Sequence, residues 1–249
     1  PDSATKRQAK MTAEKIKIVF AGGSAASKSP DVVVPIVNEL CKSNLPFEFY
    51  WLGITTPPLK KFQPFKDIRL ILPNDERVIV TGLIPQQQAA EIIASCNVFL
   101  APSRREGFPM ALLEAMRIGC IPIVSDFRIA NQEIIRDGTN GFIISHKDIK
   151  SFVGRLSDII KNHANYKNVY EESYKTFVKE LSFPVWRKHI YSIISGGAVY
   201  HKQRRIMKKY TYKVVVSRFK LLDKYNLIEN YMIEVLPCAI KFYKYYKNK

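Results

Sequence analysis

The sequence predicts a doubly wound α/β fold, in which helices cover both faces of a parallel sheet. Short apolar runs alternate with helical patterns of about ten residues, which indicates consecutive βα units. These runs are nearly all apolar, as expected of strands that are buried on both faces. Most are followed by glycine, serine or proline, which are typical of turns. We find no internal repeat in the 249 residues.

Each element can be assigned in order along the chain. The expected strands are residues 16–21, 47–52, 78–81, 98–101, 121–125 and 141–144. The expected helices are residues 29–41, 86–95, 109–118, 130–135, 149–162, 166–181 and 186–194. Pro30 and Pro109 stand in the first turns of their helices, where the N–H that proline lacks is not needed.

Composition indicates a folded domain with a distinct extension. Apolar residues make up 47% of the chain and aromatic residues 12%, which is enough to form a core. We expect residues 1–14 to be a linker, residues 15–195 to form the α/β domain and residues 196–249 to form a basic, amphipathic and mainly helical extension. The net charge is +17, and the extension holds thirteen Lys and Arg against three Asp and Glu.

The spacing of the cysteines and histidines argues against a structural metal site and a CxxC motif. Four of each are present, without the spacing of a metal site or of a CxxC pair, so we expect no metal. The cysteines have mostly apolar neighbours, which is typical of reduced thiols in a cytoplasmic protein. No apolar stretch approaches about 18 residues, and no signal peptide pattern is present, so we expect no membrane span. The chain begins at Pro1, which suggests that a longer protein contains it.

The extension has several possible partners. Residues 201–209 are densely basic, apolar residues recur at helical spacing over 221–236, and residues 240–247 mix lysine with aromatic residues. One interpretation is an interfacial anchor on anionic lipid, at the inner face of a membrane. Alternatives are a helical hairpin that packs on a preceding domain, or a contact with a partner protein. Nucleic acid fits least well, because no recognisable nucleic-acid-binding module accompanies the charge.

The carboxyl ends of the expected strands point to a ligand site. In an open parallel sheet, ligands bind outside these ends. Gly22 and Gly23 follow the first strand, Gly53 the second and Gly82 the third, and such residues permit close backbone approach. The alternative is that these turns need glycine for their own geometry.

The segment 101–116 holds the most unusual pattern of the chain. Pro109 suits the start of a helix, so the free N–H groups of Met110 and Ala111 can bind an anion. Glu114 is the one charge within residues 109–116. A carboxylate among apolar residues is costly unless it accepts hydrogen bonds, which a ribose diol could donate. Alternatively, Glu114 lies on a narrow solvent-exposed stripe or pairs with Arg117.

Residues 106–116, EGFPMALLEAM, resemble the Glu-x₇-Glu signature of the retaining GT-B glycosyltransferases of the group 1 type, glycosyltransferase family 4. Residues 119–125, 137–142 and 183–186 are similar to further motifs of that family, and the resemblance covers about residues 15–195. It implies that this stretch is a nucleotide-sugar-binding domain, the C-terminal half of the GT-B fold. The acceptor-binding half would precede Pro1.

The resemblance also implies roles for individual residues. Glu106 would bind the hydroxyls of the donor sugar, and Glu114 those of the ribose. The backbone of Gly107, Phe108, Pro109 and Met110 would face the sugar or the diphosphate, and Gly22 and Gly23 would border it. Gly82, Leu83 and Ile84 would lie near the base, and a uridine diphosphate sugar is favoured over a guanosine diphosphate sugar. Glu106 and Lys28 are the expected catalytic residues.

Lys28 is expected to neutralise the donor diphosphate. It matches the lysine of the family's Arg-x₄-Lys pair, and a cation just before a helix is unfavourable unless an anion binds there. The alternative is a solvated surface lysine. Gly23 stands where the family has arginine, so one positive charge is missing. Arg104 or Arg105 could replace it, although such arginines are more often solvated.

Two classes of function stay open at this point. The first is an enzyme half that transfers a sugar to a glycan or lipid-linked acceptor. By the resemblance it needs no side-chain nucleophile, because the leaving diphosphate helps to deprotonate the acceptor, and it does not necessarily need a metal, because positive charge or helix dipoles can stabilise the diphosphate. Retention of both Glu106 and Glu114 favours it. The second is a non-catalytic binding or scaffolding subunit, which Gly23 favours.

Overall fold

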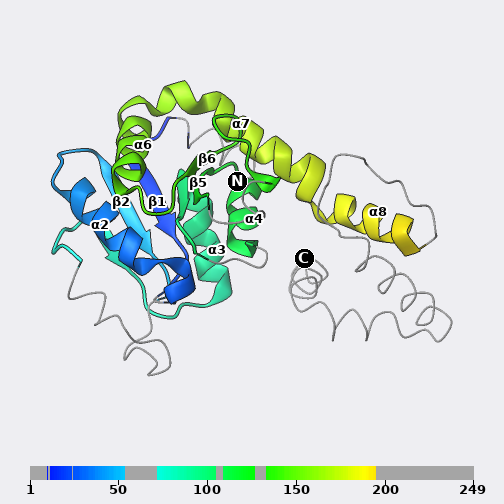
Figure 1. Ribbon diagram of the computed structural model, residues 1–249, viewed down its shortest axis with the longest axis horizontal. Helices are drawn as coiled ribbons and strands as arrows, with labels where there is room; N and C mark the ends of the chain where they lie inside the picture. Colours follow the sequence, from blue (N-terminus) through cyan, green and yellow to red (C-terminus); the bar gives the residue numbers. More distant parts are fainter. Residues whose placement is uncertain are drawn as a thin grey trace. The chain divides into compact units, whose positions relative to one another are not determined.

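Figure 1 shows the computed structural model, which describes residues 10, 12–23, 25–53, 72–104, 109–126 and 133–194. Within these residues, six parallel strands form one sheet in the order β3-β2-β1-β4-β5-β6. The strands are β1 (Ile16–Phe20), β2 (Phe47–Trp51), β3 (Val78–Val80), β4 (Val98–Ala101), β5 (Ile121–Ser125) and β6 (Phe142–Ile144). Each lies within one residue of its predicted range at both ends. The order is that of a doubly wound Rossmann-like sheet, so the predicted fold class is confirmed.

Helices cover both faces of this sheet (Figure 1). α2 (Pro30–Cys41) packs against α6 (Ile149–Asn162) on one face. On the other face, α4 (Met110–Arg117) packs against both α3 (Gln86–Ser95) and α7 (Lys167–Thr176). Side chains of β1, β2, α2 and α6 form one continuous apolar core. The chain therefore buries strands on both sides, as their apolar sequences predict.

The aromatic residues of β1 and β2 form the densest part of the core beside the site described below. Phe20, Phe49 and Trp51 are all fully buried. The Phe20 ring meets the Trp51 ring edge to face, with 4.9 Å between their centroids. This geometry aligns the positive ring edge with the negative ring face and adds to the stabilisation from burial. The carboxyl ends of β1 and β2 are therefore fixed side by side.

Three predicted helices differ from the structure. The stretch 166–181 is not one helix, because a 3₁₀ turn at His163–Tyr166 precedes α7 and a π-helical segment, Phe177–Leu181, follows it. At that junction the Thr176 hydroxyl donates to the Glu172 carbonyl four residues earlier, a contact that commonly distorts helices. Only two residues of the range 130–135 are described as helical, three lie outside the described residues, and residue 135 is described without helical structure.

The last helix also starts earlier than predicted. α8 is Phe183–Ile194, whereas the prediction began at residue 186. Pro184 lies in its first turn, a position that proline tolerates well. The Phe183 and Trp186 rings stack with their centroids 5.6 Å apart, which explains why the helix includes Phe183.

One residue of the predicted linker 1–14 packs tightly against the domain. Lys10 is buried, and its Nζ donates to the Cys96 carbonyl and to Cys120 Sγ, the latter over 3.2 Å. The side-chain amide of Asn97 donates in turn to the Lys10 carbonyl over 2.9 Å. These contacts lie at the amino ends of the strands, which is the edge opposite the site described below.

The chain divides into two compact units, residues 1–177 and 178–249. The first contains the sheet with α2 to α7, and in the second the structure describes α8 and the few residues before it. The basic extension, residues 196–249, lies outside the described residues. In the described part of the chain, no helix has both the length and the apolar character needed to cross a membrane.

Candidate functional site

A small cavity lies where the connections from two neighbouring strands diverge. β1 and β4 are adjacent in the sheet, and the chain leaves β1 towards β2 but leaves β4 towards β5. The cavity has a volume of about 180 Å³. It is lined by the end of β1, the end of β4, Lys28 and the start of α4, with Pro109, Met110, Ala111 and Leu112 on the last. This is the crevice in which doubly wound folds bind ligands.

Lys28 reaches this cavity because the turn after β1 is compact. It is the last residue of a 3₁₀ helix, Ala26–Lys28, and its side chain is one of those that line the cavity. Gly22 makes room for it, since a Cβ at Gly22 would lie 2.8 Å from the Cβ of Lys28 and 2.1 Å from the Phe20 ring. Both distances are far below van der Waals contact. Lys28 therefore lines the cavity, whereas Gly22 packs behind it and is not one of the lining residues; their roles towards a donor stay predictions.

The start of α4 forms the other wall. Pro109 has φ −80° and ψ 78°, so the helix begins at Met110, one residue later than predicted. The cavity thus meets the first turn of a helix, whose N–H groups have no partners within the helix. Leu112, Leu113, Ala115 and Met116 are buried in the core. Glu114 is partly buried and lies further along α4 than the residues that line the cavity.

Other predicted site residues are not at this cavity. Gly82, Leu83 and Ile84 follow β3, which β2 separates from β1 in the sheet. Leu83 is 77% exposed, the highest exposure among the large apolar side chains of the described residues. Glu106, Gly107 and Phe108 lie outside the described residues.

Gly23 occupies a position from which any side chain is excluded. Its φ is +55°, and a Cβ there would lie 2.6 Å from the carbonyl oxygen of Gly53. The Trp51 indole Nε1 donates to the Gly23 carbonyl over 2.9 Å, and the Gly23 N–H donates to the Leu52 carbonyl over 3.0 Å. The conformation of this turn therefore requires glycine at position 23 and does not accommodate arginine there.

Arg104 is engaged by a carboxylate. Its guanidinium forms an ion pair with Asp31 in the first turn of α2, and its backbone N–H donates to the Ser27 carbonyl over 2.8 Å. The loop after β4 is thereby attached to the turn after β1. The suggestion that Arg104 replaces the missing positive charge is weakened, because Asp31 already compensates its charge. Arg105 lies outside the described residues.

A second polar contact lies at this edge of the sheet, and no sequence pattern had indicated it. Ser29 Oγ and His146 Nε2 form a hydrogen bond of 2.8 Å, although 117 residues separate them in sequence. His146 follows β6, and its backbone N–H donates to Asp126 Oδ1 over 2.9 Å. Burial lowers the pKa of His146, and the nearby Arg104 cation lowers it further. His146 is therefore neutral at neutral pH.

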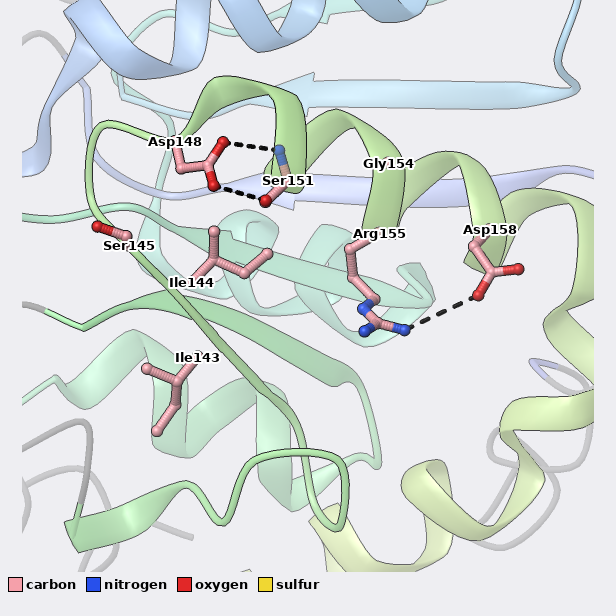
Figure 2. A pocket seen from close by; sticks show the side chains of 8 residues that line it. All are labelled: Ile143, Ile144, Ser145, Asp148, Ser151, Gly154, Arg155 and Asp158. Carbon is pink, nitrogen blue, oxygen red and sulfur yellow. Dashed lines mark hydrogen bonds and ion pairs between the residues drawn. The ribbon is translucent and has the colours of Figure 1, made fainter.

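A second hollow lies between β6 and α6 (Figure 2). Its volume is about 490 Å³. Its charged groups have partners within the domain, since Asp148 accepts from the Ser151 N–H and hydroxyl over 3.0 and 2.6 Å. Arg155 lies 3.8 Å from the Asp158 carboxylate and 4.2 Å from the centroid of the Phe142 ring. These contacts cap and stabilise α6, so the hollow has a structural explanation.

A family model and several similar proteins agree on the family of this chain. The model of a family described as glycosyl transferases group 1 matches residues 2–176. The lipopolysaccharide 1,6-galactosyltransferase of Salmonella typhimurium is 32% identical over 121 residues, which cover 47% of this chain and 34% of that protein. The putative colanic acid biosynthesis glycosyltransferase WcaL of the same organism is 20% identical over 197 residues, which cover 76% and 47%. The chain spans between a third and a half of the length of these relatives.

Solved structures show the same fold. The C-terminal domain of the group 1 family protein LpcC from Francisella tularensis aligns with a TM-score of 0.61 and 20% identity, over 73% of this chain and 94% of that one. Anabaena HepE in complex with UDP-glucose aligns with a TM-score of 0.62 and 14% identity, over 78% and 52%. These neighbours identify the sheet as the Rossmann-like part of a GT-B fold. Because the family model covers well over half of the residues, the chain belongs to the group 1 glycosyl transferases.

Proposed function

We propose that this chain is the donor-binding half of a retaining glycosyltransferase of family 4. It would take a sugar from a nucleoside diphosphate and pass it to a glycan or lipid-linked acceptor. One observation carries the proposal, namely that Lys28 and the first turn of α4 line the same cavity at the switch point. A lysine ammonium and the N–H groups of a helix start both attract anions, so together they suit a diphosphate.

The reaction then depends on stabilising a leaving group. As the bond between the sugar and the diphosphate breaks, negative charge grows on the diphosphate, and fixed positive charge lowers the barrier. Lys28 and the α4 amides would provide that charge. Glu106 would hold the sugar hydroxyls and Glu114 the ribose hydroxyls. The Glu-x₇-Glu spacing over residues 106–114 supports these roles. Retention needs no side-chain nucleophile, because the leaving diphosphate can take the acceptor proton.

The donor we propose is a uridine diphosphate sugar. HepE has been solved with UDP-glucose and TarM with UDP, and both share the fold of this chain. The exposed Leu83 beyond β3 would contact the base. The names of the relatives concern lipopolysaccharide and colanic acid, which favours an acceptor in polysaccharide synthesis.

Calorimetric titration with UDP and GDP tests the proposal. We expect the chain to bind UDP, and to bind GDP more weakly. Lys28→Met should weaken UDP binding by about tenfold or more, as loss of a hydrogen bond to a charged group does. Lys15→Met is the matched control, because Lys15 is exposed beside the amino end of β1 and its loss changes the net charge equally. Equal effects of the two substitutions would contradict the proposed diphosphate site.

Turnover gives the second test. We expect the 249-residue chain, incubated with a labelled nucleotide sugar, to show slow hydrolysis at most, because the acceptor-binding half is a separate region. Full transfer to an added acceptor would contradict the proposal that this chain is only the donor half. Failure to bind any nucleoside diphosphate would favour the non-catalytic alternative.

A further inference from the structure

We propose that Ser29 and His146 are positioning residues, which hold the Lys28 turn at the switch-point cavity. The inference rests on the proposed function and extends it to two residues outside the motifs of the sequence. Its starting point is the hydrogen bond between Ser29 Oγ and His146 Nε2, 2.8 Å long and buried. This contact joins the turn after β1 to the turn after β6.

Ser29 has a backbone conformation that its own residue type does not favour. With φ 59° and ψ 56°, it is the one non-glycine residue with positive φ in the described part of the chain. A side chain in this left-handed region crowds the following carbonyl. Such a conformation persists when the surroundings hold it, and it is common at functional sites. Ser29 is completely buried, so its surroundings are protein on all sides.

This conformation connects the Lys28 turn to α2. The Ser29 N–H donates to the Ala26 carbonyl over 3.2 Å, which closes the 3₁₀ helix that ends at Lys28. The Ser29 carbonyl accepts from the N–H groups of Val32 and Val33 over 3.0 and 3.1 Å, which starts α2. The direction of the chain at Lys28 therefore depends on the two dihedral angles of Ser29. A change in either angle would alter the direction of the Lys28 turn relative to α2.

His146 is well placed to fix those angles. Its own backbone is attached to the end of β5 through Asp126, so the imidazole is presented from a rigid edge of the sheet. The charged groups that face it are Arg104, Asp31, Asp126 and Lys147. Burial, together with the cations among these groups, lowers the pKa of His146 and favours the neutral ring. A neutral imidazole supplies the hydrogen bond without adding a positive charge that would repel Lys28.

A double-mutant cycle with Lys28 separates positioning from simple stability. We expect Ser29→Ala and His146→Leu each to weaken UDP binding by about three- to tenfold, the effect of one buried hydrogen bond. In the Lys28→Met background both substitutions should have no further effect, because the residue through which they act is gone. Binding of uridine, measured by ligand-observed NMR, should not change. His146→Gln, whose amide can reach Ser29, should recover most of the affinity.

Two further variants control for the loss of a buried hydroxyl and for strain in the backbone at Ser29. Ser173→Ala removes an equally buried hydroxyl, which donates to the Cys120 carbonyl over 2.7 Å far from the cavity, and it should not change UDP binding. Ser29→Gly accepts the left-handed backbone without strain but lacks the hydroxyl, so it should fold and still lose affinity.

The outcomes distinguish this inference from the proposed function. If the unmodified chain does not bind UDP, the proposed function fails and this inference fails with it. If the unmodified chain binds UDP and Ser29→Ala or Ser29→Gly binds it equally well, only the positioning role is overturned. Additive effects with Lys28→Met would likewise show that Ser29 and His146 act on stability alone.

Discussion

At the scale of single residues, the two glutamates of the signature should have separate roles. Glu114 lies within α4, about 8 Å along the helix axis from Pro109 at 1.5 Å per residue, which suits a ribose beyond the phosphates. Glu106 precedes the helix, where the transferred sugar would lie. Glu114→Ala should weaken UDP and UDP-sugar equally, by about 1.5–3 kcal/mol. Glu106→Ala should weaken only the UDP-sugar.

Calorimetry with both ligands and both variants provides the measurement. Glu114→Gln, which keeps the size of the side chain, is the control for packing around α4. Equal losses of UDP affinity in Glu106→Ala and Glu114→Ala would contradict this division of roles, even if the chain remains a nucleotide binder.

His146 should make the stability of the domain depend on pH. Its pKa in the folded chain lies below the ordinary value of 6.5, so the unfolded chain binds the proton more readily. Stability is then unaffected well above pH 6.5 and falls as the pH drops below it, by at most about 1.4 kcal/mol per pH unit. Urea unfolding at pH 7.5 and pH 5.5 measures the loss. His146→Gln should lose less stability over this interval, and an equal loss would contradict the assignment.

Sequence reasoning found some of these residues and missed others for a clear reason. Lys28 and Pro109 follow strands that the βα pattern places at one sheet edge, so their proximity could be predicted. Ser29 and His146 are 117 residues apart, and Arg104 and Asp31 are 73 apart. Each of these pairs joins two turns whose shapes no periodic pattern specifies. Such contacts can be identified only from the three-dimensional structure of the domain.

At the scale of elements, the strands were predicted more accurately than the helices. A strand buried on both faces has a continuous apolar sequence that ends sharply at a turn residue. A helix end depends more on individual hydrogen bonds. The change from α7 to the π-helical segment at Phe177–Leu181 coincides with the contact between the Thr176 hydroxyl and the Glu172 carbonyl. Helical periodicity alone does not reveal that contact.

The turn between β1 and α2 yields a prediction about the missing arginine. Gly23→Arg would restore the family's residue in sequence, but its Cβ would lie 2.6 Å from the Gly53 carbonyl oxygen. The positive φ adds strain of about 1 kcal/mol or more for any side chain. We therefore expect Gly23→Arg to lower both the unfolding free energy and the affinity for UDP. Gly138→Arg is the matched control, because Gly138 also has positive φ but a Cβ there meets nothing within 4 Å.

Urea unfolding and UDP titration of both variants provide the test. Loss of stability in both variants, with loss of UDP binding in Gly23→Arg alone, is the expected pattern. Tighter UDP binding by Gly23→Arg would show that the turn opens readily, contrary to its packing against Gly53.

At the scale of the whole molecule, the basic extension yields the remaining prediction. Residues 198–249 carry a charge of +10 and apolar residues at helical spacing. We expect the full chain to sediment with vesicles that contain anionic lipid, and a chain ending at residue 197 to remain in solution. The difference should shrink at high salt, since screening weakens attraction between exposed charges. Equal sedimentation of both chains, or none at low salt, would argue against a membrane role.

The burial of Lys10 fixes this residue at the edge of the sheet opposite the Lys28 turn. Its ammonium attaches Lys10 to the amino edge of the sheet, at Cys96 and Cys120. The strands between that edge and the switch-point cavity are four or five residues long, roughly 13–17 Å at 3.3 Å per residue. We expect a pull on the chain before Lys10 to load the contacts of Lys10 first, at the edge of the sheet opposite the cavity. The turn that carries Lys28 should then bear less of that force.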